Sequence, residues 1–361
     1  MAELRGGQQV KPLDSYTSTG AKFWHHMSQM EAYRAGDSDT VISTHVSPTG
    51  VCNLRCKYCS TDFRDPSRNI PLAVIQDYVE RLQRRGLRAV ILTGGGEPML
   101  YPEITELIHW LAYDRKLRVA LITNGTQMRK VDPRLFYLLD WVRISVNLFD
   151  GWEEKIEGTD VCSTVGLSIV YTDQHQEAPS EPWVEIFRKV SKLADRTHAK
   201  YVRVLPNCLL KQEDLLARHV ELDALFAEVG DGRFFHQFKV HRTPQHEVCH
   251  QSYFRPYLSE VPWHETGEPG SVYPCDSVVL NPGNPGGDAE YGHQHFAPEY
   301  QLCRPQDVLK YIDGKIPARF MPKVHCAGCV FADTVDMLGR WKADGTRPEK
   351  TEEDLRHVAF V

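Results

Sequence analysis

Apolar positions recur along the middle of the chain with two alternating periods, one typical of strands and the other of helices. Short apolar or alternating runs predict strands, and longer amphipathic runs between them predict helices. The predicted strands cover residues 40–46, 89–93, 117–123, 141–147, 165–171 and 201–205. The predicted helices cover residues 21–35, 71–86, 102–114, 132–139, 182–196 and 212–228. This alternation indicates an α/β fold with a parallel sheet and crossover helices.

The segment 71–86 shows how the pattern defines an element. Its apolar side chains fall on one helical face, at Leu72, Ile75, Val79 and Leu82. Pro71 stands at the start, where a missing N–H does no harm, and Gly86 stands at the end. We therefore expect an amphipathic helix with its apolar face against the sheet.

The pattern changes near residue 230. Residues 259–300 are rich in Pro, Gly and polar residues and contain few periodic runs. We expect four parts: an N-terminal helical extension over residues 1–39, the α/β part over 40–230, a small irregular domain over 231–345, and a tail over 346–361. The irregular part is expected to be organised around a metal site rather than a large apolar core.

Composition narrows the function classes. The 42 Lys and Arg residues are outnumbered by 48 Asp and Glu residues, so the net charge of −6 gives no general attraction to a nucleic-acid backbone. The sequence contains no run of about 18 apolar residues, so we do not expect a membrane span. The N-terminal segment lacks the apolar core of a secretory signal, so we expect a cytoplasmic protein with no membrane partner.

Ten cysteines fall unevenly along the chain. In a reducing compartment, clustered cysteines are better explained as metal ligands than as disulfides. One group is Cys52, Cys56 and Cys59, and the other comprises Cys249, Cys275, Cys303, Cys326 and Cys329. Cys162 and Cys208 are isolated and are expected to be small core residues.

The first group follows the first predicted strand, with spacings of four and three residues. A loop of this kind can wrap a [4Fe–4S] cubane so that three irons each take one thiolate. The fourth iron then stays open for a substrate or cosubstrate, by the same logic as an open position on catalytic zinc. The alternative is a zinc site with its fourth ligand elsewhere in the chain.

The Cys-x3-Cys-x2-Cys pattern, with Tyr58 before the last cysteine, resembles the radical S-adenosylmethionine (SAM) superfamily. The resemblance extends over residues 40–228 and implies a partial (βα)6 barrel. The second predicted strand ends in Gly94-Gly95-Gly96-Glu97-Pro98, similar to the motif that holds the SAM amino group in the family. Glycines allow the backbone to approach a ligand, and a carboxylate or carbonyl there accepts from an ammonium.

The resemblance also implies SAM contacts at the carboxyl ends of the other strands. Asn124 would close the third strand, Ser145 and Asn147 would contact the ribose, and Arg203 would pair with the SAM carboxylate. The cofactor-binding residues implied are Gly95, Gly96, Glu97, Asn124, Ser145, Asn147 and Arg203. The alternative for Asn124, Ser145, Asn147 and Arg203 is a structural polar residue at a strand end.

The chemistry implied is reductive cleavage of SAM. One electron from the cluster yields methionine and a 5′-deoxyadenosyl radical, which abstracts hydrogen from a substrate inside the barrel. Iron–sulfur clusters reach the very negative potentials this requires, whereas zinc has no redox chemistry. An electron donor such as flavodoxin or ferredoxin is then expected, and no catalytic side chain acting on the substrate is identified.

The second cysteine group resembles the twitch, or short SPASM-type, extension of radical SAM enzymes, which binds an auxiliary [4Fe–4S] cluster. The implied ligands are Cys249, Cys275, Cys326 and Cys329. The gap between Cys249 and Gly270 is longer than usual, so Cys303 is the substitute for Cys249. A four-cysteine zinc site that pins the small domain is the alternative.

Three functions follow in order of preference. The first is a radical SAM enzyme that oxidises, epimerises or rearranges a small molecule or a modified nucleobase, with a DNA substrate left open. The second is a peptide-modifying maturase, disfavoured because residues 1–39 are too short and irregular for a leader-binding domain. The third is a zinc-stabilised binding protein without catalysis.

Overall fold

The structure is a computed structural model of the 361-residue chain. It describes residues 16–56, 58–61, 64–146, 156–172, 181–208, 210, 212–239, 241–280, 297–348 and 355–361.

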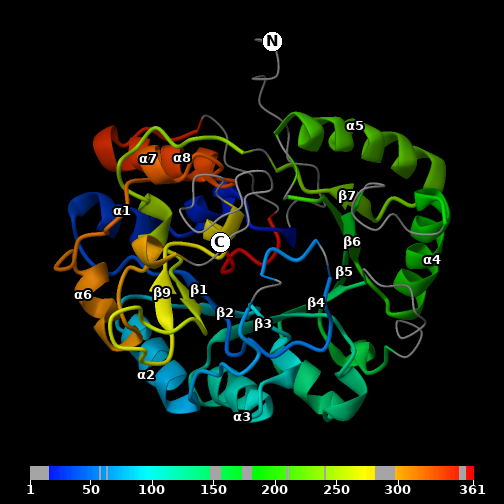
Figure 1. Ribbon diagram of the computed structural model, residues 1–361, viewed down its shortest axis with the longest axis horizontal. Coiled ribbons are helices and arrows are strands. Elements are labelled where there is room, and N and C mark those ends of the chain that lie inside the picture. Colours follow the sequence, from blue (N-terminus) through cyan, green and yellow to red (C-terminus); the bar gives the residue numbers. More distant parts are fainter. Residues whose placement is uncertain are drawn as a thin grey trace.

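A single nine-stranded sheet organises the described residues, in the order β7-β6-β5-β4-β3-β2-β1-β8-β9. The strands are β1 (Ser43–Val46), β2 (Ala89–Leu92), β3 (Arg118–Thr123), β4 (Trp141–Ser145), β5 (Val165–Tyr171), β6 (Tyr201–Pro206), β7 (Phe234–His236), β8 (Tyr257–Ser259) and β9 (Ser271–Tyr273). Every pairing is parallel except that of β8 with β9. The sheet curves into an open arc, with β7 and β9 at its two edges (Figure 1). This confirms the α/β partial barrel predicted from the sequence.

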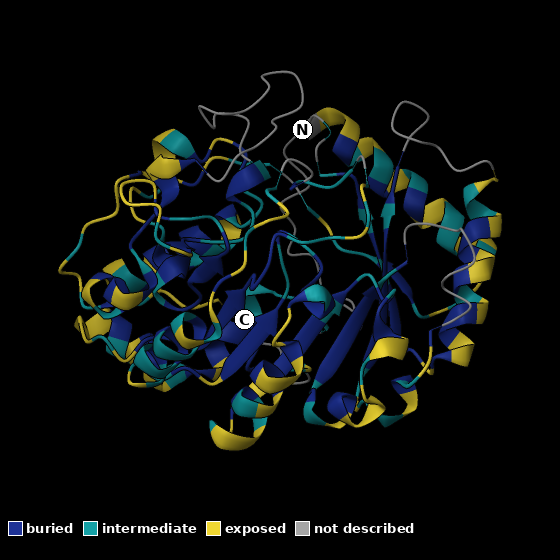
Figure 2. Cartoon of the chain, turned by 60° about the horizontal axis from the view of Figure 1, so that its bottom comes forward, coloured by how far each residue is buried: buried dark blue, intermediate teal, exposed yellow. Residues whose placement is uncertain are grey.

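Helices surround the outside of the arc (Figure 1). They are α1 (Met27–Ala35), α2 (Leu72–Gln83), α3 (Ile104–His109), α4 (Trp183–Arg196), α5 (Gln212–Val229), α6 (Val308–Ile312), α7 (Pro322–His325) and α8 (Ala332–Asp344). On α2 the predicted stripe lies inward, with Ile75, Val79 and Leu82 fully buried, and Gly86 adopts a left-handed conformation just beyond the helix. Figure 2 shows the strands buried and the outer helix faces exposed.

Two predicted helices differ in form. Residues 21–35 are not one helix, because His26 leaves the helical conformation between a 3-10 helix at Gly20–His25 and α1. Phe23 and Trp24 then pack edge-on against Phe254 and Trp341, residues distant in sequence that the local period cannot encode. The short helix predicted near 132–139 is a 3-10 helix, Pro133–Leu138, which begins where Asp132 accepts a hydrogen bond from the Arg134 N–H.

Among the described residues beyond 250, most elements other than α8 are short, yet β8 and β9 extend the barrel sheet beside β1. The apolar residues Val272 and Tyr311 of this segment belong to the same core cluster as the barrel strands. The segment thus packs against the barrel, and the boundaries at residues 39, 230 and 345 stay predictions.

The two ends of the described chain meet at one end of the barrel interior. Lys22 Nζ donates to the backbone oxygen of Phe360 at 3.4 Å, and His26 Nε2 lies 2.9 Å from the backbone oxygen of Val358. Figure 1 shows the C-terminus within the arc of strands. These segments form a floor beneath the strand ends.

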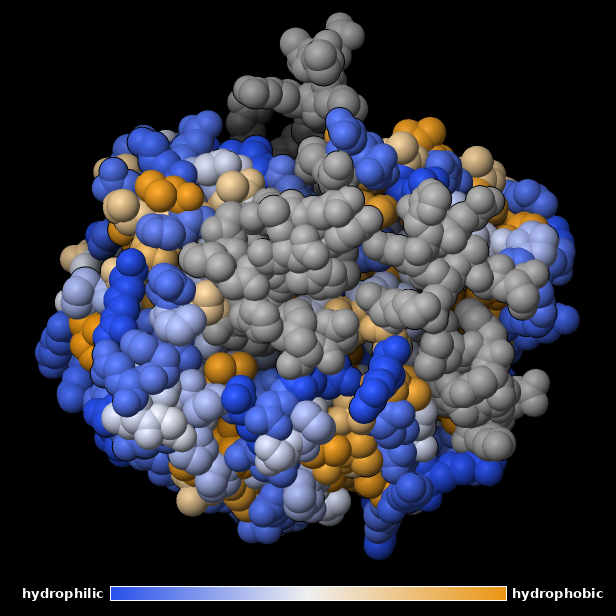
Figure 3. All heavy atoms as spheres, in the orientation of Figure 1, coloured by the Kyte–Doolittle hydropathy of each residue, from blue (hydrophilic) through white to orange (hydrophobic). Residues whose placement is uncertain are grey.

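The outer surface is mainly polar. Hydrophilic residues predominate around the periphery of the face in Figure 3, with apolar residues scattered among them. Within the described ranges, no helix is both long and apolar enough to cross a lipid bilayer.

Candidate active site

The first cysteine group lies in the loop that follows β1. Cys52, Cys56 and Cys59 are half-buried and form no disulfide, and the N–H of Cys59 donates to the Cys56 carbonyl at 3.0 Å. Burial, together with the nearby thiols of Cys59 and Cys52, raises the pKa of Cys56. The structure therefore brings these three sulfur ligands close together.

Polar donors surround the sulfur of Cys59. Arg64 Nη1 donates to Cys59 Sγ at 3.5 Å, and Thr61 Oγ1 lies 3.3 Å from the same atom. Arg64 also donates to the backbone oxygens of Leu54 and Thr61, so it ties both sides of the loop together. A cation and a hydroxyl beside a thiol suit a thiolate ligand. The residues present fit a cluster held by three thiolates.

The glycine turn after β2 supports the cysteine loop directly. The N–H of Gly96 donates to the Thr49 carbonyl at 2.9 Å, and the N–H of Glu97 donates to the Val51 carbonyl at 2.7 Å. A Cβ atom on Gly96 would lie 2.2 Å from the Val51 oxygen, and one on Gly95 would lie 1.9 Å from Glu260 Oε1. Glycine is therefore required for contact with the protein itself, in addition to any approach to a ligand.

Glu97 is engaged within the protein. Its carboxylate is 3% exposed and accepts hydrogen bonds from the Met99 N–H, the Thr123 hydroxyl and the Asn124 N–H at 3.0, 2.6 and 2.7 Å. Burial raises its pKa. A ligand ammonium at this turn would thus meet main-chain carbonyls, the other acceptor that the motif offers.

The remaining predicted SAM contacts lie at the same rim. Asn124 Nδ2 donates to Asn53 Oδ1 at 3.0 Å, which links the end of β3 to the cysteine loop. Ser145 pairs in register with Ser168, and Arg203 donates to the Ser168 hydroxyl at 3.2 Å and to Gln237 Oε1 at 3.0 Å. Asn147 lies outside the described residues. The SAM-binding roles of these side chains stay predictions.

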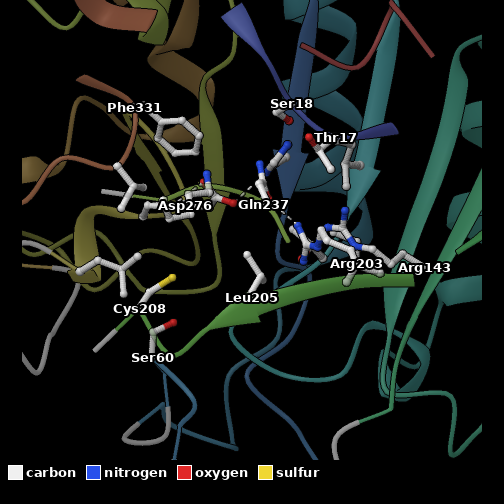
Figure 4. Close-up of a pocket in the computed structure, with 18 of the residues that line it drawn as sticks. Thr17, Ser18, Ser60, Arg143, Arg203, Leu205, Cys208, Gln237, Asp276 and Phe331 are labelled. Atoms are coloured by element: carbon white, nitrogen blue, oxygen red, sulfur yellow. Dashed lines mark hydrogen bonds and ion pairs between the residues drawn. The ribbon is translucent and has the colours of Figure 1, made fainter. Parts of the chain in front are cut away.

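A cavity of about 310 Å³ runs down the inside of the barrel. Tyr58 and Ser60 of the cysteine loop line it at one end, and Trp141 and Phe360 line it near the floor. Figure 4 shows Arg143 and Arg203 together on one side, with Asp276 and Phe331 on the opposite side. The cavity thus connects the cysteine loop with a set of charged side chains.

Most of the charged residues that line the cavity were not predicted as site residues from the sequence. Besides Arg203, the cavity is lined by Lys22, His45, Arg143, Lys239, Arg255 and Asp276. Burial and the neighbouring charge of Arg143 lower the pKa of Arg203 to about 9. A signal existed in one strand, because alternation along β4 places Arg143 on the same face as Trp141 and Ser145. The other cations come from segments that only the fold assembles.

The second cysteine group forms a separate site. Four of its members line one small cavity: Cys249, Cys275, Cys326 and Cys329. Burial raises the pKa of Cys275 well above its ordinary value, and the other three thiols raise it further. Cys303 instead sits in the strand-bridging segment, where its carbonyl accepts from the Val272 N–H at 3.0 Å. The structure therefore gathers Cys249 rather than Cys303 with the other three cysteines.

Over the described ranges, no group of three or more His, Cys, Asp or Glu side chains is arranged to hold a single metal ion. A cubane holds its thiolates further apart than one ion does, so the two sites differ in the spacing they need. The two isolated cysteines lie in different places. Cys208 lines the barrel cavity, whereas the Cys162 thiol contacts the backbone oxygen of Thr164 at 3.4 Å.

Comparison with known proteins identifies relatives of part of the chain. The radical SAM superfamily matches residues 46–204. An S-adenosylmethionine-dependent nucleotide dehydratase of Selenomonas ruminantium is 32% identical over 109 residues, covering 29% of this chain and 38% of that protein. A GTP 3′,8-cyclase of Helicobacter pylori is 28% identical over 141 residues, covering 34% of this chain and 44% of that protein. This chain thus spans less than half the length of either of these relatives.

Among solved structures, Streptococcus suis SuiB bound to precursor peptide SuiA is similar over 66% of this chain and 60% of that chain, with a TM-score of 0.49 and 12% sequence identity.

Proposed function

Because residues 46–204 match the radical SAM superfamily, we propose that the chain is an enzyme of this kind, which uses SAM and a [4Fe–4S] cluster to abstract hydrogen from a substrate in the barrel cavity. The observation that carries the proposal is the placement of three free thiols at the mouth of that cavity. Cys52, Cys56 and Cys59 lie in one loop, and Tyr58 and Ser60 of the same loop line the cavity.

Cys52, Cys56 and Cys59 would hold the cluster, with SAM at its open iron. When bound, the cluster supplies the electron that cleaves SAM to methionine and a 5′-deoxyadenosyl radical. The chain's own contribution is positioning: Arg64 and Thr61 contact the sulfur of Cys59, and the glycine turn holds the loop at Val51. A rigid loop keeps the reacting groups in one geometry.

The rim of the barrel would orient SAM. Glu97 fixes the end of β3 through Thr123 and Asn124, so that the main chain of the glycine turn is held for the SAM amino group. Arg203, held by Ser168 and Gln237, presents a guanidinium for the SAM carboxylate. Ser145 lies in register beside this layer, in the position expected for a ribose contact.

We propose an auxiliary [4Fe–4S] cluster of the twitch type at the second cysteine site. The cluster would be held by Cys249, Cys275, Cys326 and Cys329. Because these four cysteines line one small cavity, the structure supports Cys249 rather than Cys303 as the fourth ligand. Four thiolates leave no iron open, so this cluster would relay an electron to or from the substrate radical or brace the segment. Four-cysteine zinc binding is the competing proposal.

The substrate is proposed to be a small molecule or a nucleobase-linked compound, and the reaction an oxidation, epimerisation or rearrangement. The two curated relatives support a nucleotide, since their names describe a nucleotide dehydratase and a GTP cyclase. A flavodoxin or ferredoxin would supply the electron. A peptide-modifying role is the second candidate function, and the cavity volume of about 310 Å³ favours a smaller substrate.

A paired substitution tests the function. In anaerobically reconstituted protein, Cys56→Ala should abolish 5′-deoxyadenosine formation from SAM, because one cluster ligand is lost. Cys162→Ala is the matched control, since this thiol belongs to neither cysteine group and should leave SAM cleavage unchanged. Continued SAM cleavage in Cys56→Ala, or a wild-type protein that binds zinc and no iron at this loop, would overturn the proposal.

A further inference from the structure

The floor and walls of the barrel cavity are strongly cationic. Six basic side chains line the cavity: Lys22, His45, Arg143, Arg203, Lys239 and Arg255. Among the described lining residues, Asp276 is the only acidic one. Arg143 and Arg255 are buried, so water does not screen their charges as it does at a surface. An excess of buried positive charge is unfavourable unless an anion compensates it.

The one acidic side chain is already engaged. Asp276 Oδ2 lies 3.2 Å from His45 Nδ1. Burial alone would raise the pKa of Asp276, but the charges of His45, Arg255 and Lys239 hold it well below its ordinary value. Asp276 therefore stays ionised, and one carboxylate cannot balance the whole set.

Two buried guanidinium donors of these basic side chains lack an acceptor in the described part of the chain. Arg143 is 8% exposed and Arg255 is 3% exposed, yet Nε of Arg143 and Nη2 of Arg255 have no hydrogen-bond partner among the described residues. Buried guanidinium donors normally find an acceptor. Aromatic rings hold the cations in place instead: Phe331 lies 4.4 Å from Lys239 Nζ and 4.7 Å from Arg255 Cζ. These contacts orient Lys239 and Arg255, and one donor each of Arg143 and Arg255 lacks an acceptor among the described residues.

Strand register places these cations at different depths. Ser145, Ser168 and Arg203 are in register and form an upper layer at the rim. Arg143 pairs with Gly166, two residues earlier, and Gly166 pairs with Tyr201. Two residues along a strand correspond to about 6–7 Å, with both side chains on one face. Arg143 therefore lies one layer below Arg203.

A SAM carboxylate at Arg203 would compensate only the upper layer. Arg143 lies deeper on β4, and Arg255 near the floor, where it donates to the backbone oxygen of Val361 at 2.9 Å. Lys239 lies over the same Phe331 ring as Arg255, so these two cations are neighbours. When SAM is accounted for, the lower cations thus have no anionic partner among the described lining residues other than Asp276.

We propose that the lower part of the cavity binds the phosphoryl groups of a small-molecule substrate that carries at least two negative charges, with Arg143, Arg255 and Lys239 as its ligands. This inference rests on the proposed function, because it places the substrate below SAM in the same cavity. Guanidinium groups match tetrahedral phosphoryl oxygens through paired donors, and several cations around one volume suit a multiply charged group. A duplex backbone would meet surface cations rather than a floor nine-tenths buried.

The test is calorimetric titration of the anaerobically reconstituted holoenzyme, with SAM present, using inorganic tripolyphosphate as the probe. Citrate, titrated at equal ionic strength, is the carboxylate probe of similar charge. We expect one tripolyphosphate per chain and at least tenfold weaker citrate binding. Arg143→Met and Lys239→Met should each weaken tripolyphosphate binding tenfold or more. Arg134→Met, at an 85% exposed side chain, is the matched control and should bind like wild type.

The outcomes separate cleanly. The proposal is overturned if the wild-type protein shows no saturable tripolyphosphate binding. It is also overturned if Arg143→Met and Lys239→Met both bind tripolyphosphate as tightly as wild type, or if citrate binds as tightly as tripolyphosphate. A single-stranded thymidine 12-mer that binds tighter than tripolyphosphate, and loses affinity in the same variants, moves the site to nucleic acid and also overturns it. Should Arg143→Met not fold, Lys239→Met decides the question.

Iron content and 5′-deoxyadenosine formation are measured on the same preparation, with iron determined before and after the titration. SAM cleavage without tripolyphosphate binding refutes the substrate class alone. Tripolyphosphate binding by a protein that holds no cluster refutes the proposed function and leaves an anion site.

Discussion

At the scale of single residues, packing inside the protein accounts for the glycines of the motif after β2. Gly96 lies against the backbone of Gly50 and Val51, and its N–H and that of Glu97 bond to the segment that leads into Cys52. The motif therefore shapes the cysteine loop in addition to its proposed contact with SAM. Glu97 acts in the same way, because its carboxylate joins the ends of β2 and β3.

Gly96→Ala should destabilise the protein by about 1–3 kcal/mol, because the new methyl group would overlap backbone atoms that cannot move aside. Gly232→Ala is the control, since no atom lies within 4 Å of a Cβ built there. Urea unfolding curves measure both variants. Equal midpoints for the two would show that the loop yields to the methyl group.

Lys22 predicts a pH dependence of stability. Burial, with the charges of Arg143 and Arg255, lowers its pKa from 10.5 to about 7. Between about pH 7 and 10.5 the unfolded chain therefore binds a proton that the folded chain does not, so stability from this group rises with pH. Its contribution is unfavourable below about pH 7, where Lys22 must be buried with its charge.

Lys22→Met removes this dependence. The difference in free energy of unfolding, wild type minus variant, should rise by up to about 1.4 kcal/mol per pH unit across that window. Nearby His357 titrates outside this window, because burial and the charge of Lys22 lower its pKa to about 4. A difference that is flat from pH 7 to 10 contradicts the buried, uncharged state of Lys22.

At the scale of elements, α8 fixes the N-terminal segment that closes the floor of the cavity. Trp341 on α8 donates from Nε1 to the Met30 carbonyl on α1 at 2.7 Å and packs edge-on against Trp24. Thr17, Ser18 and Lys22, just before this contact, line the cavity. The C-terminal helix thereby supports the site through an element that precedes the barrel.

Trp341→Ala should cost about 3–5 kcal/mol, as for other buried tryptophans, because it leaves a void between α1 and α8. Tyr113→Ala, at an exposed aromatic residue, is the comparison variant and should change stability little. Thermal unfolding of the two variants gives the result. A wild-type midpoint for Trp341→Ala would mean that α8 does not anchor the N-terminal segment.

At the scale of the whole molecule, the fold places two cysteine groups at separate sites. Cys249, Cys275 and the Cys326–Cys329 turn come from three separate segments of the chain, whereas the first group is one continuous loop. The two sites sit around one sheet, since β8 extends the barrel beside β1. The proposed electron relay between them and the cavity would therefore depend on the assembled molecule.

Iron stoichiometry tests this arrangement. Wild-type protein reconstituted without oxygen should hold about eight irons per chain, and Cys326→Ala about four, because one cluster of four is lost. Cys303→Ala is the matched control and should keep about eight, since this residue is buried in the core and does not line the cavity that the four thiols share. Zinc in place of iron at the second site, or iron loss in Cys303→Ala, would contradict the assignment.

The sequence carried the order of strands and helices and the first cysteine loop. Those features are local: a period of two or 3.6 residues, or three thiols within eight positions, is written in adjacent residues. Prediction from the local pattern failed where tertiary contacts compete with it. At His26, packing of Trp24 on Trp341 breaks the expected helix.

Tertiary structure alone decided which distant side chains share a space. It placed Cys249 with Cys275 and left Cys303 in the core, and it engaged Glu97 with β3. It also gathered Arg143, Lys239 and Arg255, from β4 and two later segments, into one cavity. A sequence states which charges a chain possesses, but their mutual distances and their removal from water arise only when the sheet closes around them.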